Sequence, residues 1–173
     1  MGTNVEAGDR QIFSIQADIV KVSDSWIFGH FRFWIAGIPV GNWDDSADLK
    51  GCCAHLRTFI NKPQSRSEFG LFELGKNEVF DMLWTTMMVV DGKVSKSEPV
   101  YKDAVSRFHI SHLGMSSFDR VAMILLECQE GSQRCIWNAL PDAAIHEALL
   151  PAGEMERVSR SFLKKFDQMK AAL

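Results

Sequence analysis

Cysteine and histidine are the residue types of this chain best suited to bind a metal or to act as a nucleophile or base, and there are four cysteines and five histidines. Cys53 and His55 are two residues apart, a spacing at which side chains on a helix do not face each other. His109 and His112 form an H-x-x-H, but the alternating sequence around them favours a strand, in which they point to opposite faces. No C-x-x-C and no zinc-finger spacing occurs. We therefore expect no catalytic residue, no metal site and no cofactor.

Two further cysteines, Cys128 and Cys135, flank a predicted hairpin. A two-residue type II′ loop at Gly131-Ser132 places Cys128 opposite Cys135, at a Cα separation that permits a disulfide. Because cytosolic thiols are normally reduced, we expect two small core side chains rather than a bridge.

Phosphate-binding and hydrolase motifs are absent, since the chain contains no GxxxxGK[ST], GxGxxG or GxSxG. The polar feature that remains is a turn in which Trp43 is followed by Asp44, Asp45 and Asp48. This spacing is not that of a calcium loop, and aspartates at a helix start are explained by capping. A large aromatic beside clustered carboxylates is also typical of a protein-binding hot spot; alternatively, Trp43 folds back into the core.

The element that leads into this turn is a predicted hairpin over residues 11–35, with Ser23-Asp24-Ser25 as its turn. Its second strand places Ile27, Phe31, Phe33 and Ile35 on one face. The other face carries Phe28, His30, Arg32 and Trp34, which is too apolar for an ordinary solvated face. Either a helix covers it or it is a partner-binding surface.

The rest of the chain alternates between predicted helices and strands. We expect a helix from Asp45 or Ser46 to Pro63, a short strand over 69–74, a helix from Asn77 to Met88, and a strand over Arg107–Leu113. The Cys128 hairpin follows, then a strand or short helix over Ala144–Leu149, and a final helix whose stripe is Met155, Val158, Phe162, Phe166 and Met169. The sum is an α+β fold, a mostly antiparallel sheet with about three helices packed against it. We expect one domain over residues 11–173, preceded by a disordered or loosely held segment over residues 1–10.

The net charge and the short apolar runs of the chain disfavour nucleic acid and membranes as partners. The 173 residues carry a formal net charge of −3, which disfavours nucleic acid as the main partner because phosphate binding needs a concentrated basic surface. The longest apolar runs are far shorter than a membrane-spanning helix, and the polar first ten residues contain no secretory signal. We therefore expect a cytoplasmic protein without a membrane partner.

The segment FGHFRFWIAGIPVGNWDDSADLKGCCAHL carries a family resemblance. A strand ending in aromatics, a G-x-P-x-G-N/D turn and an acidic helix start resemble the immunity protein 42 family, and the likeness extends over most of the chain, including LPAG and the helix after it. Members are bacterial proteins encoded beside polymorphic or contact-dependent toxins. The resemblance implies a non-enzymatic protein that binds its cognate toxin tightly in the cytoplasm and neutralises it.

If that function holds, the first candidates for toxin contact are Trp43, Asp44, Asp45 and Asp48, with Trp34 and Arg32 second. Acidic side chains would steer association with the basic cleft of a nuclease toxin. Two alternatives stay open: a small metal- or Cys/His-dependent enzyme built from His109, His112 and Cys128, and an adaptor that oligomerises through Phe28 and Trp34. The identity of the toxin and the oligomeric state stay open as well.

Overall fold

The computed structural model describes residues 3–23, 25–61, 65–88, 104–111, 116–139 and 144–172. The chain divides into two compact units. Unit 1 consists of Met1–Pro63, His112–Val121 and Gly153–Leu173, whereas unit 2 consists of Gln64–Ser111 and Ala122–Ala152. Each unit has a sheet of its own.

Unit 1 is built around a five-stranded antiparallel sheet, which we call sheet A. Its strands pair in the order β1-β2-β3-β4, and β5 also pairs with β3. The strands are β1 (Thr3–Asp9), β2 (Phe13–Val22), β3 (Ile27–Ile35), β4 (Ile38–Val40) and β5 (Ala47–Asp48).

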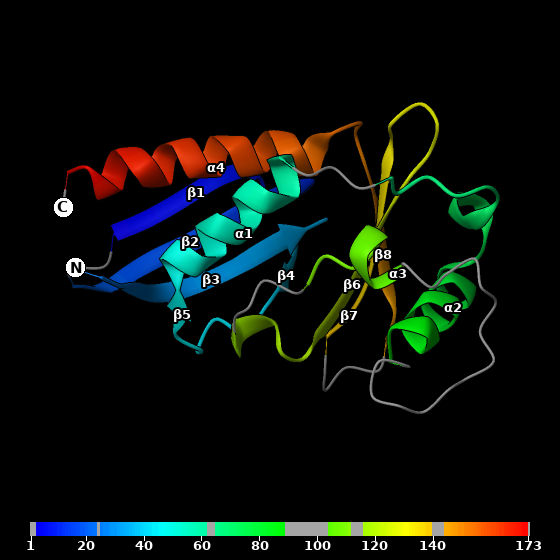
Figure 1. Cartoon of the computed structure of the whole chain (residues 1–173), viewed down its shortest axis with the longest axis horizontal. Coiled ribbons are helices and arrows are strands. Elements are labelled where there is room, and N and C mark those ends of the chain that lie inside the picture. Colours follow the sequence, from blue (N-terminus) through cyan, green and yellow to red (C-terminus); the bar gives the residue numbers. More distant parts are fainter. Residues whose placement is uncertain are drawn as a thin grey trace. The chain divides into compact units, whose positions relative to one another are not determined.

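Two helices, α1 (Leu49–Asn61) and α4 (Glu154–Lys170), cover one face of sheet A, and they lie side by side over the strands in Figure 1. The predicted alternation in β3 is confirmed, because Ile27, Phe31, Phe33 and Ile35 are all buried. The helices contribute buried stripes at intervals of three and four residues, which match the period of an α-helix. These stripes are Leu49, Cys53, Leu56 and Ile60 in α1, and Met155, Val158, Phe162 and Phe166 in α4.

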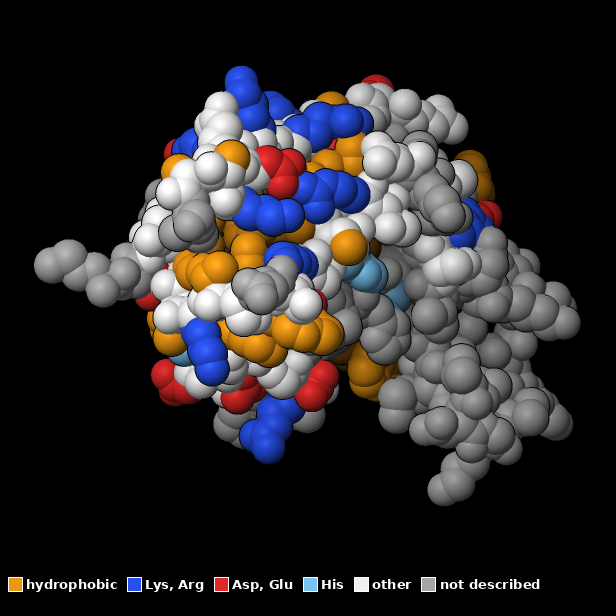
Figure 2. Space-filling model, turned by 60° about the vertical axis from the view of Figure 1, so that its left-hand side comes forward, with side chains coloured by type: hydrophobic (Ala, Val, Ile, Leu, Met, Phe, Trp, Pro, Cys, Tyr) orange, Lys and Arg blue, Asp and Glu red, His pale blue; other side chains and the backbone are white. Residues whose placement is uncertain are grey.

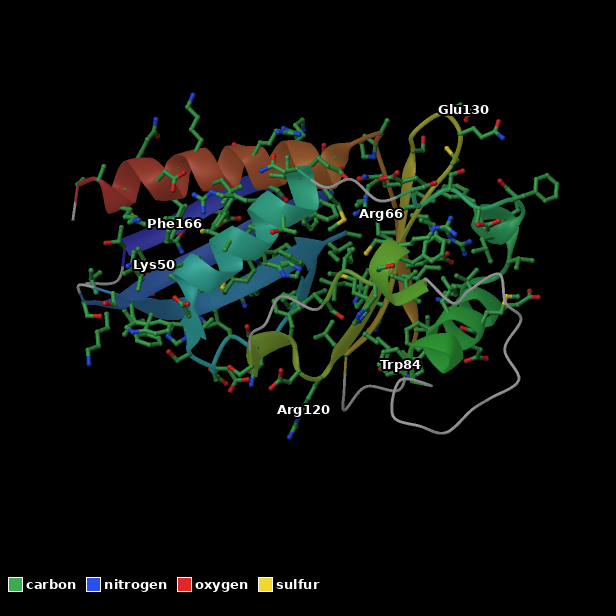
Figure 3. All side chains as sticks on the ribbon, viewed as in Figure 1. Lys50, Arg66, Trp84, Arg120, Glu130 and Phe166 are labelled. Atoms are coloured by element: carbon green, nitrogen blue, oxygen red, sulfur yellow. The ribbon has the colours of Figure 1, made fainter. Side chains whose placement is uncertain are left out.

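Aromatic rings form the centre of this core. The ring of Phe31 lies 5.8 Å from that of Phe162 in an edge-on arrangement, the geometry favoured by the aromatic quadrupole. Phe118, in the short 3-10 helix Ser116–Phe118, packs on Phe33 with ring centroids 5.1 Å apart. Phe166 lies between α4 and the strands in Figure 3.

Unit 2 contains a three-stranded sheet in the order β6-β7-β8. Its strands are β6 (Val121–Glu127), β7 (Gln133–Ala139) and β8 (His146–Leu150), and its helices are α2 (Lys76–Met88), α3 (Ala104–Arg107) and the 3-10 helix Leu71–Glu73. The core joins α2 to the strands through Val79, Leu83, Phe108, Ile124 and Ile136.

The α+β class, the helix ending at Met88 and the final helix are confirmed, and the segment Ala144–Leu149 is resolved as a strand. Several boundaries are wrong. The first helix begins at Leu49 rather than at Asp45 or Ser46, because Asp48 serves as its N-terminal cap. Thr3–Asp9 forms β1 instead of a loose segment, since Val5 and Ala7 are buried by the helices over the sheet. The single domain over residues 11–173 stays a prediction.

The segments predicted as strands at 69–74 and 107–113 also differ. Gly70 adopts a φ of 80°, which L side chains rarely adopt, and the turn there leads into the 3-10 helix Leu71–Glu73. Ala104–Arg107 is helical, and His109 forms only an isolated bridge to Ile124. Residues 112–113 of that predicted strand lie outside the described residues.

The β6–β7 hairpin has a different register from the one predicted. The amide of Cys128 donates to the carbonyl oxygen of Ser132 and that of Gly131 to the carbonyl oxygen of Cys128, both over 3.0 Å. A turn with Gly131 at a φ of 85° therefore pairs Cys128 with Ser132 instead of with Cys135. Both thiols are free in the structure. Cys135 is buried, but Cys128 is half-buried and not in the core as predicted.

Candidate functional site

The face of sheet A opposite α1 and α4 carries rows of polar and aromatic side chains, set by the register of the strands. Glu6, Gln16 and Arg32 are aligned across β1, β2 and β3. In the next row, Ser14 stands opposite Trp34. Since alternate residues of a strand point to opposite faces, these five side chains share one surface, which we call the open face.

The side chain of Gln16 organises this surface. Its Oε1 atom accepts a hydrogen bond from Nε of Arg32 and another from Nε1 of Trp34, each over 2.9 Å. Gln16 is only 7% exposed, so both donors are held by a buried acceptor. Such a contact fixes the orientation of the guanidinium and of the indole relative to the sheet.

The guanidinium of Arg32 contacts two indole rings. Its Cζ atom lies 4.4 Å from the ring centroid of Trp34 and 4.3 Å from that of Trp43, which belongs to the segment after β4. Each contact has the geometry of a cation–π interaction. Trp43 also packs on His30, with ring centroids 5.4 Å apart. The structure therefore brings Trp43 into contact with Arg32, which also contacts Trp34 two residues further along β3. We call these three residues the Trp34–Arg32–Trp43 cluster.

A second arginine borders the cluster. Arg10 lies over the ring of Trp34, with Cζ 4.6 Å from the centroid, and its Nε and Nη2 atoms donate to the two carboxylate oxygens of Glu6 over 2.7 and 2.6 Å. The hydrogen bond from Arg10 lowers the pKa of Glu6, against an opposing contribution from burial. The pKa of Arg32 is lowered, first by burial and second by the positive charge of Arg10.

The three predicted aspartates have different roles. Oδ1 of Asp48 accepts from the amide of Lys50 over 3.0 Å and Oδ2 from that of Gly51 over 3.1 Å, so this carboxylate caps α1. Asp44 is exposed and Asp45 half-buried, and neither carboxylate has a hydrogen bond or ion pair within the part of the chain that the structure describes. Of the predicted site residues, Arg32, Trp34 and Trp43 are in contact, while Asp44 and Asp45 directly follow Trp43.

Sequence reasoning missed Gln16, Glu6 and Arg10. Gln16 lies on the polar face of its strand but is buried, and the alternation of the sequence alone gives no sign of that burial. Glu6 and Arg10 are not among the predicted site residues, because the sequence predicts a loosely held segment over residues 1–10. Their i,i+4 spacing is helical in pattern, yet here it spans the end of β1 and the following turn.

The residues of the alternative enzyme lie in different surroundings. Nε2 of His109 is 2.6 Å from Oγ of Ser111, and the ring of Trp84 packs edge-on against His109. Cys128 lies at the β6–β7 turn, and His112 is outside the described residues. Among the residues described, no group of three or more His, Cys, Asp or Glu side chains could hold a metal ion. Burial raises the pKa of Cys53 to about 12 and raises that of Cys135 as well, which keeps both thiols protonated near neutral pH.

The face shown in Figure 2 is mixed in charge. Figure 2 shows Lys and Arg, Asp and Glu, and hydrophobic side chains close together on the face in view, rather than a continuous basic region. No helix within the described ranges has the length and apolar character needed to cross a membrane.

Comparison with known families assigns the chain. The family model described as immunity protein 42 matches residues 5–165, a range that includes the whole open face. The chain belongs to the immunity protein 42 family. Among solved structures, it resembles CdiI from Burkholderia dolosa AUO158 with a TM-score of 0.69 and 17% identity, over 92% of this chain and 99% of that one. At 17% identity this likeness shows that the two proteins share a fold, and nothing beyond the fold. No curated protein matches it.

Proposed function

We propose that this immunity protein binds its cognate bacterial toxin in the cytoplasm and neutralises it by occupying an essential surface, without catalysing a reaction. Membership of an immunity-protein family supports this function.

The observation that carries the proposal is the Trp34–Arg32–Trp43 cluster on the open face. Tryptophan and arginine are the residue types most enriched among interface hot spots. All three side chains are half-buried, so each is supported from below and still presents surface to a partner. The bonds from Gln16 hold two of them in place before binding, which reduces the entropy cost of association.

Asp44 and Asp45 extend the proposed surface. Their carboxylates follow Trp43 directly and are unpaired within the described structure. A basic surface on the toxin would be attracted by them, which increases the association rate at low ionic strength. Asp48, in contrast, caps α1, and we assign it a structural role beside the proposed interface.

The candidate toxin for the test is the C-terminal domain of the protein encoded by the gene immediately upstream. It is purified with this protein and also co-expressed with it in a bacterial host. Trp43→Ala should weaken binding at least about 30-fold, the range of a hot-spot truncation, and should reduce survival of the toxin-producing host. Trp43→Phe should restore much of the affinity because it keeps an aromatic face over Arg32.

Trp26→Ala is the matched control, since Trp26 is 51% exposed and lies outside the cluster, against Phe28. It should change affinity less than about 3-fold, and circular dichroism should show that all variants stay folded. Affinity of the Trp43→Ala variant within about 3-fold of the unmodified protein's would remove the open face from the proposal. Failure of the unmodified protein to bind or protect against that toxin would overturn the function itself.

A further inference from the structure

We infer that Arg32 is the receptor for a carboxylate of the protein partner, the side chain of an Asp or Glu presented by the toxin. This inference rests on the proposed function and specifies the chemistry of its central contact. The sequence alone predicts that acidic residues of this chain attract a basic toxin surface. The inference adds a contact of opposite sign, in which a basic residue of this chain binds an acidic residue of the toxin.

The hydrogen-bonding state of Arg32 is the main observation. Its Nε atom is occupied by Gln16, but neither of its Nη atoms has a hydrogen bond or ion pair within the residues that the structure describes. The other buried or half-buried arginines of those residues each have a carboxylate partner. These pairs are Arg57 with Asp167, Arg66 with Glu127, Arg107 with Glu68, and Arg134 with Glu147.

The geometry of the cluster selects the direction of approach. The rings of Trp34 and Trp43 lie against the guanidinium, and the Nε edge faces Gln16. The donors that remain are those of the two Nη atoms. Two parallel N–H groups in one plane match the two oxygens of a carboxylate, which is the bidentate pairing characteristic of arginine.

The local charge also favours an incoming anion. Arg10 and Arg32 carry two positive charges, and Glu6, the carboxylate nearest to them in the register, is held by both donors of Arg10. Glu6 also attracts Arg32, but one carboxylate cannot balance two guanidinium groups, so these three residues carry one excess positive charge, although the protein as a whole has a net charge of −3. A partner carboxylate would neutralise that charge and reduce the repulsion between the two arginines.

A second unsatisfied group lies beside the cluster. Nδ1 of His30 is buried and has no hydrogen-bond partner among the described residues, and the ring of His30 packs on Trp43. Buried polar atoms are normally satisfied, so the packing next to Trp43 leaves one polar group of the chain unpaired among the described residues.

A protein carboxylate is favoured over a nucleic-acid phosphate. The fork of Nη donors suits both anions, but the free carboxylates of Asp44 and Asp45 follow Trp43, and a polyanion would be repelled by them. A folded toxin domain can present one acidic side chain to Arg32 and basic side chains to the aspartates. Recognition would then depend on a mixed-charge patch.

The test compares Arg32→Lys and Arg32→Gln with Arg120→Gln in titrations against the upstream-encoded toxin domain. Arg120 is exposed, and in Figure 3 its side chain extends away from the ribbon, so Arg120→Gln should bind like the unmodified protein. Arg32→Lys keeps the charge but loses the planar fork, and it should weaken binding at least about 10-fold. Arg32→Gln should weaken it further. Circular dichroism should confirm that each variant is folded.

A double-mutant cycle then identifies the partner group, with each exposed Asp and Glu of the toxin replaced by Asn or Gln. One toxin carboxylate should show strong coupling to Arg32, so that its replacement costs little once Arg32 is already changed. Absence of coupling to any toxin carboxylate would overturn the inference. An Arg32→Lys affinity within about 2-fold of the unmodified protein's, while Trp43→Ala still weakens binding at least about 30-fold, would also overturn the inference. In that case the proposed function would stand. Binding of a duplex DNA that is lost in Arg32→Gln would also overturn the inference, in favour of phosphate.

Discussion

Nζ of Lys165 donates a hydrogen bond to the backbone carbonyl oxygen of Glu6 over 2.7 Å. Lys165 belongs to α4, and Glu6 belongs to β1, the edge strand of sheet A. An edge strand presents unpaired carbonyl and amide groups to which another chain can add a strand, and lysine is a common protection against such pairing. This contact therefore links the helix layer to the edge and occupies one acceptor of β1.

Replacing Lys165 tests this protection. Lys165→Met should reduce stability by about 1 kcal/mol or less, the net value of one hydrogen bond, and should increase self-association because the edge loses a guarding charge. Light scattering over a concentration series measures the change. Lys164→Met is the control, since Lys164 is an exposed neighbour on the same helix. Equal behaviour of the two variants would show that Lys165 does not guard the edge.

Phe162 should be among the most sensitive core positions. It is fully buried and contacts the rings of Phe31 and Phe166, so Phe162→Ala leaves a cavity and should cost about 3–5 kcal/mol. Phe69→Ala removes the same atoms at a residue that is 100% exposed, and its cost should stay within about 0.5 kcal/mol. Urea unfolding followed by circular dichroism compares the two. Similar losses would contradict the position of Phe162 in the core.

The four thiols should react at very different rates. Cys52, Cys53 and Cys135 are buried, whereas Cys128 is half-buried. A thiol reagent at pH 8 should therefore modify Cys128 first in the folded protein, and all four after denaturation. Cys128→Ser should abolish the early phase. An early phase that persists in this variant would place a second thiol at the surface.

The buried thiols also make stability depend on alkaline pH. The pKa of Cys53 rises from 9.0 to about 12 on folding because burial disfavours the thiolate. Between these values the unfolded chain binds fewer protons than the folded chain, so stability should fall as pH rises from 9 towards 12. Cys53→Ala should flatten the slope measured in urea unfolding over this range. If Cys53→Ala leaves the dependence of stability on pH unchanged, groups other than Cys53 cause the loss of stability at alkaline pH.

Glu6 should affect stability at the acid end. Its folded pKa lies below the ordinary value of 4.5, chiefly because of the hydrogen bond from Arg10. The stabilisation by its carboxylate is therefore complete above pH 4.5 and is lost as pH falls through the folded pKa. The difference in urea midpoint between the unmodified protein and Glu6→Gln should shrink on acidification below 4.5. Glu78→Gln, at an exposed position of α2, serves as the control, and a constant difference for Glu6 would refute the assignment.

Local periodicity predicted the elements whose burial alternates regularly. The face of β3 formed by Ile27, Phe31 and Phe33 and the stripe of α4 follow from a period of two or of about 3.6 residues. Where the predicted secondary structure is wrong, residues distant in sequence contact the segment concerned. Nη1 of Arg134 donates to the carbonyl oxygens of Phe72 and Leu74 over 2.8 and 2.7 Å, so a side chain occupies two acceptors that a strand would offer to a neighbouring strand.

The candidate site was predictable in its residue types but not in its arrangement. Trp43 is predicted from a large aromatic beside clustered carboxylates in a turn, whereas Trp34 and Arg32 are predicted from the second, weakly polar face of the hairpin. Their contact depends on Gln16, which reaches Arg32 and Trp34 from the neighbouring strand, and on the return of the segment after β4 towards β3. Cross-strand register is a property of the folded sheet, so the spacing of these residues in sequence does not reveal it.

The discontinuity of unit 1 has a consequence for synthesis on the ribosome. The apolar face of β2 and β3 is made before the whole of unit 2, whereas Phe162 and Phe166, which cover it, are made afterwards. At ordinary elongation speeds the delay is on the order of 10 s, and contacts between such distant segments also form slowly. During that interval the apolar face of the nascent sheet has no cover from Phe162 and Phe166, so the core of unit 1 is completed only after α4 has been synthesised.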